Sequence, residues 1–258
     1  MSSITIAFPI QEKDAQTSLD AAHQLANALR AHVVLFANRP SDRLQAILQA
    51  SALNWVDLGL GSRVNRYIVD NAAIAGWNPW GYKSGPNYDF FAILDWCQNN
   101  NADWVLLAEA DLLPIGASVE TRVNDLLSGA QDKWVVGAKP STESKRLLDP
   151  RIRDHINGAA FYRVGSNEFG FFRRQVWMPS LIALIKYFPF FAYDCVTASG
   201  VWDLLSDHLR DSWERHRLQF HRTELMLNLS NIEVSREFIS ALGAAPTVPL
   251  FVHTKLQQ

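Results

Sequence analysis

The segment from Ala102 to Pro114 constrains the fold more than any other part of the chain. Trp104 to Ala108 form a continuous apolar run, which is typical of a short strand buried on both faces. The run ends in two carboxylates, Glu109 and Asp111, and we expect Pro114 to stop the strand ladder because proline has no N–H to donate.

Strand and helix patterns alternate around this run. Apolar and β-branched runs predict strands at 4–10, 32–37, 55–60 and 133–138. Helical spacing of apolar residues predicts helices at 17–31, 42–52, 63–75, 88–99 and 119–127, with Ser41 as one cap and Gly129 as one end. This order predicts an α/β fold with a mostly parallel sheet and helices on both faces. Without a visible repeat or linker, we expect residues 1–258 to form a single domain.

Composition narrows the class of partner and the setting. The net charge of −2 argues against a general binder of nucleic acid or anionic membranes. No apolar run approaches the roughly 20 residues that a transmembrane helix needs. The N-terminus lacks a signal-peptide pattern, and Cys97 and Cys195 suggest neither a disulfide framework nor a zinc site, so we expect a cytoplasmic protein.

Glu109 and Asp111 are candidate metal ligands. Residues two apart on an extended segment point the same way, so both carboxylates would leave the strand end together and repel each other. A divalent cation relieves this repulsion, and Mg²⁺ or Mn²⁺ suits hard oxygen ligands and nucleotide phosphates. The alternative is a pair of solvated acids at a strand-to-loop junction.

Other segments are expected at the same edge of the sheet. Ligands of open parallel sheets lie at the carboxyl ends of the strands. Residues 8–10, with Pro9 at their centre, and residues 38–40 follow the first two predicted strands. A nucleotide could therefore lie across these strand ends.

These features together resemble the GT-A glycosyltransferase superfamily, whose acidic Asp-x-Asp motif corresponds here to Glu109-Ala110-Asp111. The resemblance implies a GT-A-like fold whose residues 1–138 bind the nucleotide and whose residues 139–258 bind the acceptor. It implies an inverting transfer of a sugar from a nucleotide-diphosphate donor to a glycan or other hydroxyl acceptor.

The resemblance also assigns roles to residues of the motif and of the C-terminal segment. Asp111 would ligate Mn²⁺ or Mg²⁺ directly, while Glu109 and Ala110 would lie at the metal and the donor ribose. His253, in the segment Phe251-Val252-His253, would supply a further metal ligand. Lys255 would then reach the diphosphate.

The segment from Lys83 to Asp89 leads into the helix predicted at 88–99. Its Gly-Pro pair favours a turn, and Asn87 is expected to cap the helix, whose N-terminus attracts anions. The resemblance implies contact of this segment with the donor, through Lys83, Ser84, Gly85 and Asn87. The alternative is an ordinary loop and cap.

Two further segments complete the candidate site. Asn157-Gly158 predicts a turn before a strand, and the resemblance implies that it lines the donor and acceptor pockets; a hairpin turn without chemistry is the alternative. Asp194 follows an aromatic run, where an acid can serve as general base in an inverting transfer. It could instead cap a helix or pair with an arginine.

Two alternative functions stay open. A sugar-phosphate nucleotidyltransferase shares the fold and the metal, but it normally carries a glycine-rich basic loop after the first strand. Residues 9–14 contain no glycine, which counts against it. The other alternative is a non-catalytic carbohydrate-binding protein on the same fold.

Overall fold

The computed structural model describes residues 3–59, 84–138, 148–244 and 248–256. The predicted helix at 63–75 and the candidate residue Lys83 lie outside these residues.

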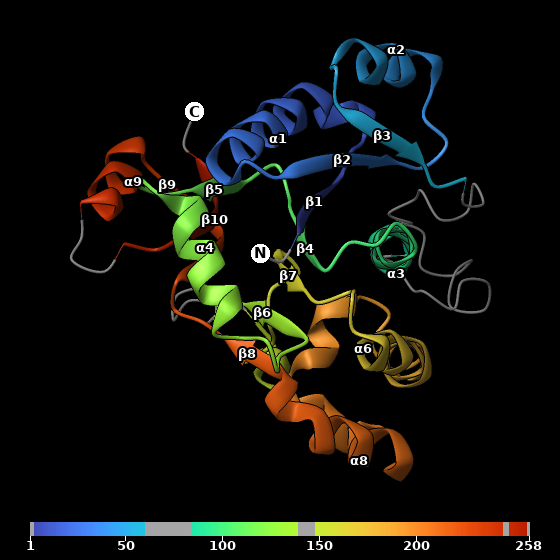
Figure 1. Ribbon diagram of the computed structural model, residues 1–258. Helices are drawn as coiled ribbons and strands as arrows, with labels where there is room; N and C mark the ends of the chain where they lie inside the picture. Colours follow the sequence, from blue (N-terminus) through green and yellow to red (C-terminus); the bar gives the residue numbers. More distant parts are fainter. Residues whose placement is uncertain (1–2, 60–83, 139–147, 245–247, 257–258) are drawn as a thin grey trace.

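A seven-stranded sheet in the order β3-β2-β1-β4-β7-β6-β8 organises the chain (Figure 1). The strands β1 to β4 are parallel to one another, whereas β7 runs antiparallel between β4 and β6. β6 and β8 are again parallel. The predicted α/β fold with a mostly parallel sheet is therefore confirmed. The strands are β1 Ile4–Pro9, β2 His32–Ala37, β3 Asn54–Asp57, β4 Trp104–Leu107, β6 Val135–Gly137, β7 Ala160–Tyr162 and β8 Phe220–Arg222.

Helices cover both faces of this sheet, as predicted. One face packs against α1 Ala15–Leu29, α2 Asp42–Ala50 and α4 Val119–Ser128. The other packs against α3 Ser84–Asn99, α6 Asn167–Phe172, α7 Met178–Ile185 and α8 Asp207–His216. Short helical turns connect these elements: η1 Glu12–Asp14, η2 Pro150–Ile152, the π-turn η3 Arg173–Trp177, η4 Tyr193–Thr197, η5 Ser199–Leu204 and η6 Arg217–Gln219.

The apolar run of β4 is explained by burial on both sides. Trp104 and Leu106 belong to the core beneath α1 and α4, whereas Val105 and Leu107 belong to the core beneath α3. Because side chains alternate across a strand, a strand between two helical layers needs apolar residues at every position.

A second, three-stranded sheet in the order β5-β10-β9 lies beside the main sheet. It comprises β5 Leu112–Pro114, β9 Met226–Val234 and β10 Phe251–Leu256, with α9 Arg236–Gly243 between the last two. The prediction that Pro114 stops the strand ladder is wrong in one respect. Pro114 is itself the last residue of β5 and is paired in register with Phe251.

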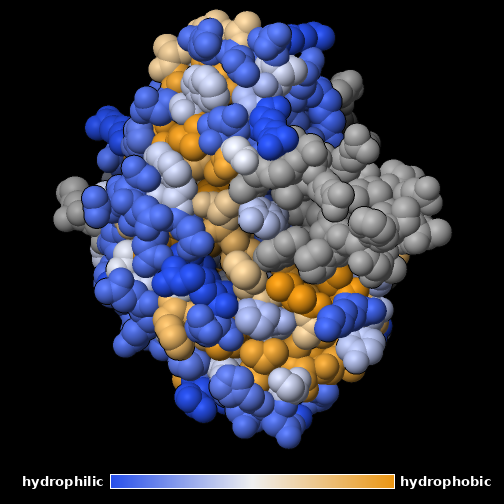
Figure 2. Space-filling model, turned by 90° about the vertical axis from the view of Figure 1, so that its right-hand side faces the viewer, coloured by the Kyte–Doolittle hydropathy of each residue, from blue (hydrophilic) through white to orange (hydrophobic). Residues whose placement is uncertain are grey.

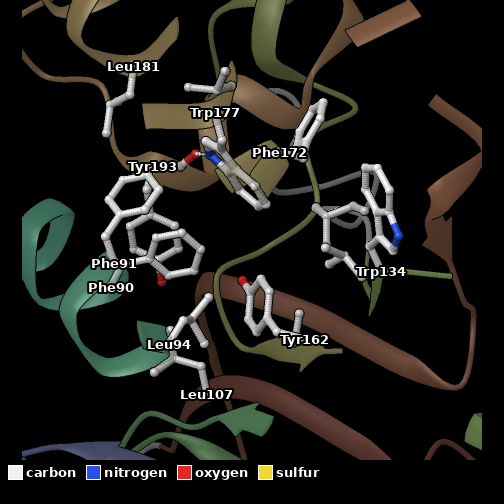
Figure 3. Packing of buried hydrophobic residues seen from close by; sticks show 14 of the residues in the cluster. Phe90, Phe91, Leu94, Leu107, Trp134, Tyr162, Phe172, Trp177, Leu181 and Tyr193 are labelled. Carbon is white, nitrogen blue, oxygen red and sulfur yellow. Dashed lines mark hydrogen bonds between the residues drawn. The ribbon is translucent and has the colours of Figure 1, made fainter. Parts of the chain in front are cut away.

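An aromatic core fixes α3 against the second half of the chain (Figure 3). Phe90 stacks on Tyr193, with ring centroids 3.9 Å apart, and makes an edge contact with Tyr162. Trp177 closes the cluster and donates its indole N–H to the Tyr193 carbonyl. The segment after α7 is thereby held against the carboxyl ends of the strands.

Several element boundaries differ from the sequence-based prediction. β3 ends at Asp57 instead of reaching residue 60, and α3 begins at Ser84 instead of Tyr88. Ser41 caps α2 by accepting a hydrogen bond from the Leu44 N–H, as predicted. Within the described residues, no helix combines the length and apolar character needed to cross a membrane.

Hydrophobic residues gather in the lower part of the face shown in Figure 2, and hydrophilic residues border them at the left and bottom of the view. Exposed large hydrophobic side chains include Phe171 in α6 and Tyr187 and Phe190 after α7. The last two are close in the sequence to residues 192–194, which line the site described next.

Candidate metal and donor site

The chain turns sharply after β4, and this turn places the two carboxylates. The Ala108 N–H extends the pairing with β1 by one bond to the Ala7 carbonyl, and the Leu112 N–H then donates to the Glu109 carbonyl. Glu109 and Asp111 therefore lie in a turn between β4 and β5. The extended geometry from which we predicted their common direction is wrong, although they do converge on one point.

That point is the imidazole of His253. In β10, His253 is paired in register with Leu112, the first residue of β5. Its Nε2 lies 2.9 Å from Asp111 Oδ1 and 3.3 Å from Glu109 Oε2. The Thr254 N–H also donates to the Asp111 carbonyl, which fixes the turn against β10. The second sheet thus brings the C-terminal histidine to the acidic turn.

The electrostatics of this cluster favour a cation. Burial alone would lower the pKa of His253, but hydrogen bonds and charges from Asp111 and Glu109 outweigh it and raise the pKa to about 10. The two carboxylates therefore favour a positive charge at the position of the imidazole. One ligand atom from each of the three residues lies within 4.8 Å of the others. Two carboxylates and an imidazole so placed fit a divalent cation, which would replace the proton.

A cavity of about 310 Å³ adjoins the cluster. It lies at the carboxyl ends of β1 and β4, between which the strand order switches direction, and this is where open α/β sheets bind ligands. Among the residues that line it are the five sequence candidates Pro9, Glu109, Asn157, Asp194 and His253, together with Asp89, Phe90 and Tyr193.

The two carboxylate oxygens of Asp194 have different surroundings. Its Oδ2 accepts a hydrogen bond from the Gly158 N–H at 3.2 Å and lies 3.7 Å from His155 Nε2. Its Oδ1 is buried and has no hydrogen-bond partner among the described residues. The first residues of η4 carry it, so it lies inside a helical turn instead of capping a later helix. Asp194 is thus anchored through Oδ2, while Oδ1 remains able to accept a hydrogen bond.

Asn87 has a different place from the one predicted. It lies inside the first turn of α3 and does not cap that helix. Its buried side chain donates to the Phe191 carbonyl and accepts from the Tyr193 N–H, at 3.0 and 2.7 Å. Asn87 therefore holds the segment that leads to Asp194.

Asn157 and Gly158 form the turn before β7, as predicted. The Asn157 side chain accepts from the Ala159 N–H, and its backbone N–H donates to the Ala138 carbonyl. A Cβ on Gly158 would lie 2.1 Å from the Tyr193 hydroxyl oxygen. The missing side chain therefore makes room for Tyr193.

A second cavity of about 260 Å³ lies at the carboxyl ends of β1 and β2. Its lining mixes apolar side chains, such as Ile10 and Phe36, with polar groups at 38–41. Pro9, Gln11 and Asp89 line both cavities, so the two share a wall. Together they form one groove along the strand ends.

Asp89 is a site residue that sequence reasoning missed. It lies in α3 and is half-buried, and its Oδ1 has no hydrogen-bond partner among the described residues. Burial raises the pKa of its carboxyl to about 7. The available signal was an acid within an otherwise apolar helix face, one position before Phe90 and Phe91. His155, the neighbour of Asp194, was also missed.

The remaining candidates surround this groove less directly. Ala110 lies in the turn between the two carboxylates, and Ser84 and Gly85 are the first residues of α3. Lys255 follows His253 in β10, but its side chain lies outside what the structure describes, as does Lys83.

Comparison with known proteins gives structural likeness only. No sequence-family model matches the chain, and no curated protein does. Glucosyl-3-phosphoglycerate synthase from Mycobacterium tuberculosis, in complex with Mn²⁺, UDP and glucosyl-3-phosphoglycerate, is similar at 13% identity and a TM-score of 0.38, over 63% of this chain and 57% of that one.

Two other similar structures have different activities in their names. A mannosyltransferase from Pyrobaculum calidifontis, in complex with GDP-Man and Mn²⁺, has 12% identity and a TM-score of 0.40, over 71% of this chain and 52% of that one. A cytidylyltransferase from Leptospira borgpetersenii has 10% identity and a TM-score of 0.40, over 73% and 70%. The chain thus spans between about half and 70% of the length of these three proteins.

Proposed function

We propose that the chain is a GT-A-like glycosyltransferase that moves a sugar from a nucleotide-diphosphate donor to the hydroxyl of a glycan or another acceptor. One observation carries this proposal. Glu109, Asp111 and His253 converge at the switch point of a mostly parallel sheet, beside a cavity that Asp194 also lines. The convergence of a cation-binding cluster and a separate carboxylate on one cavity suits transfer away from a diphosphate.

Asp111, His253 and Glu109 would hold the metal. The mixed oxygen and nitrogen donors favour Mn²⁺ over Mg²⁺, because Mg²⁺ strongly prefers oxygen ligands. When bound, such an ion neutralises charge on the leaving diphosphate. Glu109, whose side chain is about half exposed, is the ligand that can also reach a donor.

The groove gives the donor an orientation. Its cavity at the ends of β1 and β2 suits a nucleoside, because apolar walls alternate there with polar groups. Its larger cavity beside His253 then takes the diphosphate and the sugar. In this arrangement residues 1–138 bind the nucleotide, and residues 139–258 supply the acceptor side through Asn157 and Asp194.

Asp194 acts as general base in an inverting transfer. Its Oδ1 takes the proton of the acceptor hydroxyl, and the acceptor oxygen forms a bond to the anomeric carbon of the sugar. The bond from that carbon to the diphosphate oxygen breaks at the same time, so the configuration inverts. The Gly158 N–H and His155 keep Asp194 Oδ2 in place during this step.

The alternative of a nucleotidyltransferase fits the segment after β1 poorly. That segment contains η1 and carries Glu12, which accepts a hydrogen bond from the Ser41 hydroxyl and lies 3.8 Å from Arg43. A carboxylate there repels a triphosphate, where a nucleotidyltransferase needs basic groups. A non-catalytic carbohydrate-binding protein would bind a donor without turning it over.

The melting temperature of the protein tests the proposal. UDP or GDP should raise it when Mn²⁺ is present, because a ligand that binds only the folded state stabilises it by about 2.7 kcal/mol at 100 times its Kd. Neither nucleotide should do so after EDTA treatment. Uridine and guanosine, which lack the diphosphate, provide the control and should show no Mn²⁺ dependence.

Two results decide between the candidates. If UDP and GDP with Mn²⁺ both leave the melting temperature unchanged, the glycosyltransferase proposal is contradicted. If they raise it but a panel of nucleotide sugars yields no nucleoside diphosphate with any hydroxyl acceptor or with water, the non-catalytic alternative is supported.

A further inference from the structure

The proposed reaction gives no role to Asp89, an acid that lines the groove. It lines both cavities, whereas Glu109, Asp194 and His253 line only the larger one. It lies in α3 between Asn87, which holds the 191–193 segment, and Phe90, which stacks on Tyr193. The packing of its helix therefore fixes its position.

The environment of the Asp89 carboxyl is unusual for a buried acid. Its Oδ1 is buried without a hydrogen-bond partner among the described residues. Burial raises its pKa to about 7, and among the described residues no hydrogen bond or charge offsets that effect. Buried polar groups are almost always hydrogen-bonded, so an unpartnered one in a cavity indicates a ligand that donates to it.

The chemistry of that ligand follows from what surrounds Asp89. The ionised form of this carboxyl would repel a phosphate. A cation is better served by Glu109, Asp111 and His253, and the cluster of possible metal ligands found among the described residues does not include Asp89. A neutral hydrogen-bond donor, such as a hydroxyl group, fits the unpartnered oxygen. It also fits the lack of a compensating positive charge among the described residues.

The position of Asp89 along the groove identifies the hydroxyl. A nucleotide sugar is linear, with base, ribose, diphosphate and sugar in that order. With the base in the cavity at β1 and β2 and the diphosphate beside His253, the ribose lies at the shared wall formed by Pro9, Gln11 and Asp89. This step rests on the proposed function.

We propose that Asp89 accepts hydrogen bonds from the ribose hydroxyls of the donor and makes the site selective for ribonucleotides over deoxyribonucleotides. A hydrogen bond to a charged group contributes enough to change affinity roughly 10- to 100-fold. Asp89 is thus a specificity-determining residue, separate from the metal ligands and from Asp194.

Binding of UDP, 2′-deoxy-UDP and 3′-deoxy-UDP in the presence of Mn²⁺ tests this inference by calorimetry; the guanosine series replaces it if GDP is the tighter ligand. The wild-type protein should prefer the ribonucleotide roughly 10- to 100-fold over at least one deoxy analogue. Asp89→Ala should reduce this preference to about threefold or less, mainly by weakening UDP. Asp89→Asn retains an acceptor oxygen and should keep an intermediate preference.

Glu12→Gln is the matched control, because Glu12 lines only the cavity at β1 and β2. It should leave the ratio of UDP to deoxy-UDP affinity unchanged, whatever it does to both affinities. The circular dichroism spectrum shows whether each variant is folded. If Asp89→Ala does not fold, the comparison of wild type with Asp89→Asn decides the test.

The outcomes separate the two proposals. If no nucleoside diphosphate binds the wild-type protein with Mn²⁺, the proposed function fails and this inference with it. If UDP binds but the preference for ribose is absent, or survives unchanged in both Asp89 variants because Glu109 alone contacts the ribose, the role of Asp89 is refuted while the proposed function stands.

Discussion

His253 Nε2 lies 2.9 Å from Asp111 Oδ1, although the two residues belong to segments far apart in the sequence. The contact depends on the second sheet, in which β10 pairs antiparallel with β5 directly after the acidic turn. A C-terminal strand therefore completes a cluster that begins at the end of β4. Cation binding and docking of the C-terminal segment should consequently depend on each other.

Asn87→Ala should destabilise the protein by about 2–4 kcal/mol. The substitution leaves the Phe191 carbonyl and the Tyr193 N–H without partners, and each unsatisfied buried group costs roughly 1–3 kcal/mol. Urea denaturation measures the change. Asn99→Ala, at the exposed end of the same helix, should change stability by less than about 0.5 kcal/mol. Equal effects of the two substitutions would show that Asn87 does not hold this segment.

Gly158→Ala should cost about 1–3 kcal/mol through overpacking, because its Cβ would overlap the Tyr193 hydroxyl. Adding Tyr193→Phe removes that oxygen and should recover part of the loss, which a double-mutant cycle measures as coupling. Gly129→Ala is the control, since its Cβ would meet only ordinary contacts at 3.6 Å. Strict additivity of the two substitutions would rule out the steric conflict.

Asp194→Asn should lower turnover by roughly 10²–10⁴-fold, the usual contribution of a general base. The affinity for the nucleotide donor should change little, because Asp194 acts on the acceptor. Steady-state kinetics and donor titration provide the two values, with the exposed Asp203→Asn as control. Near wild-type turnover, or a product that retains the anomeric configuration, would remove Asp194 from this role.

Asp89→Asn should change how stability depends on pH. Burial raises the pKa of Asp89 from 3.8 to about 7, so the folded state keeps a proton that the unfolded chain releases between these values. The stability that this proton contributes is present below pH 3.8 and is lost as the pH rises through 7. Asparagine cannot ionise and avoids that loss.

The melting temperature of Asp89→Asn relative to wild type should therefore rise by a few degrees between pH 5 and pH 8, at about 2–4 °C per kcal/mol. Asp203→Asn should show no such trend. A difference that stays constant over this range would mean that the carboxyl of Asp89 is not desolvated.

The parallel half of the fold was predictable because local patterns determine it. β1, β2 and β4 lie between two helical layers, and this burial leaves an apolar run that the sequence shows directly. The same holds for α1 and α2, whose buried residues recur at helical spacing. Their positions in the structure match the prediction to within a few residues.

The second half was less predictable because pairing there is long-range. β6 and β7 have only three residues each, and so short a run does not reveal whether its partner is parallel or antiparallel. β5 escaped notice because it ends in a proline, and its partner β10 lies near the C-terminus. The start of α3 was misplaced because Gly85-Pro86 suggests a turn, whereas proline is tolerated in the first turn of a helix.

The candidate site, like the fold, was predictable only in part. The resemblance singled out Asp111, Glu109 and His253, and the structure brings these three together. The resemblance did not point to Asp89, and its environment depends on two cavities at the ends of separate strands. The role of Asn87 as a tether was equally hidden, since its partners lie more than 100 residues away.

Direct titration of the protein with Mn²⁺, with free Mn²⁺ followed by electron paramagnetic resonance, tests the metal cluster most directly. The wild-type protein should bind one Mn²⁺ in the presence of UDP or GDP, and Asp111→Asn and His253→Ala should each lose that binding while remaining folded. Asp207→Asn, an exposed acid in α8, should bind like wild type. Unchanged Mn²⁺ binding in both cluster variants would contradict the assignment of Asp111 and His253 as metal ligands.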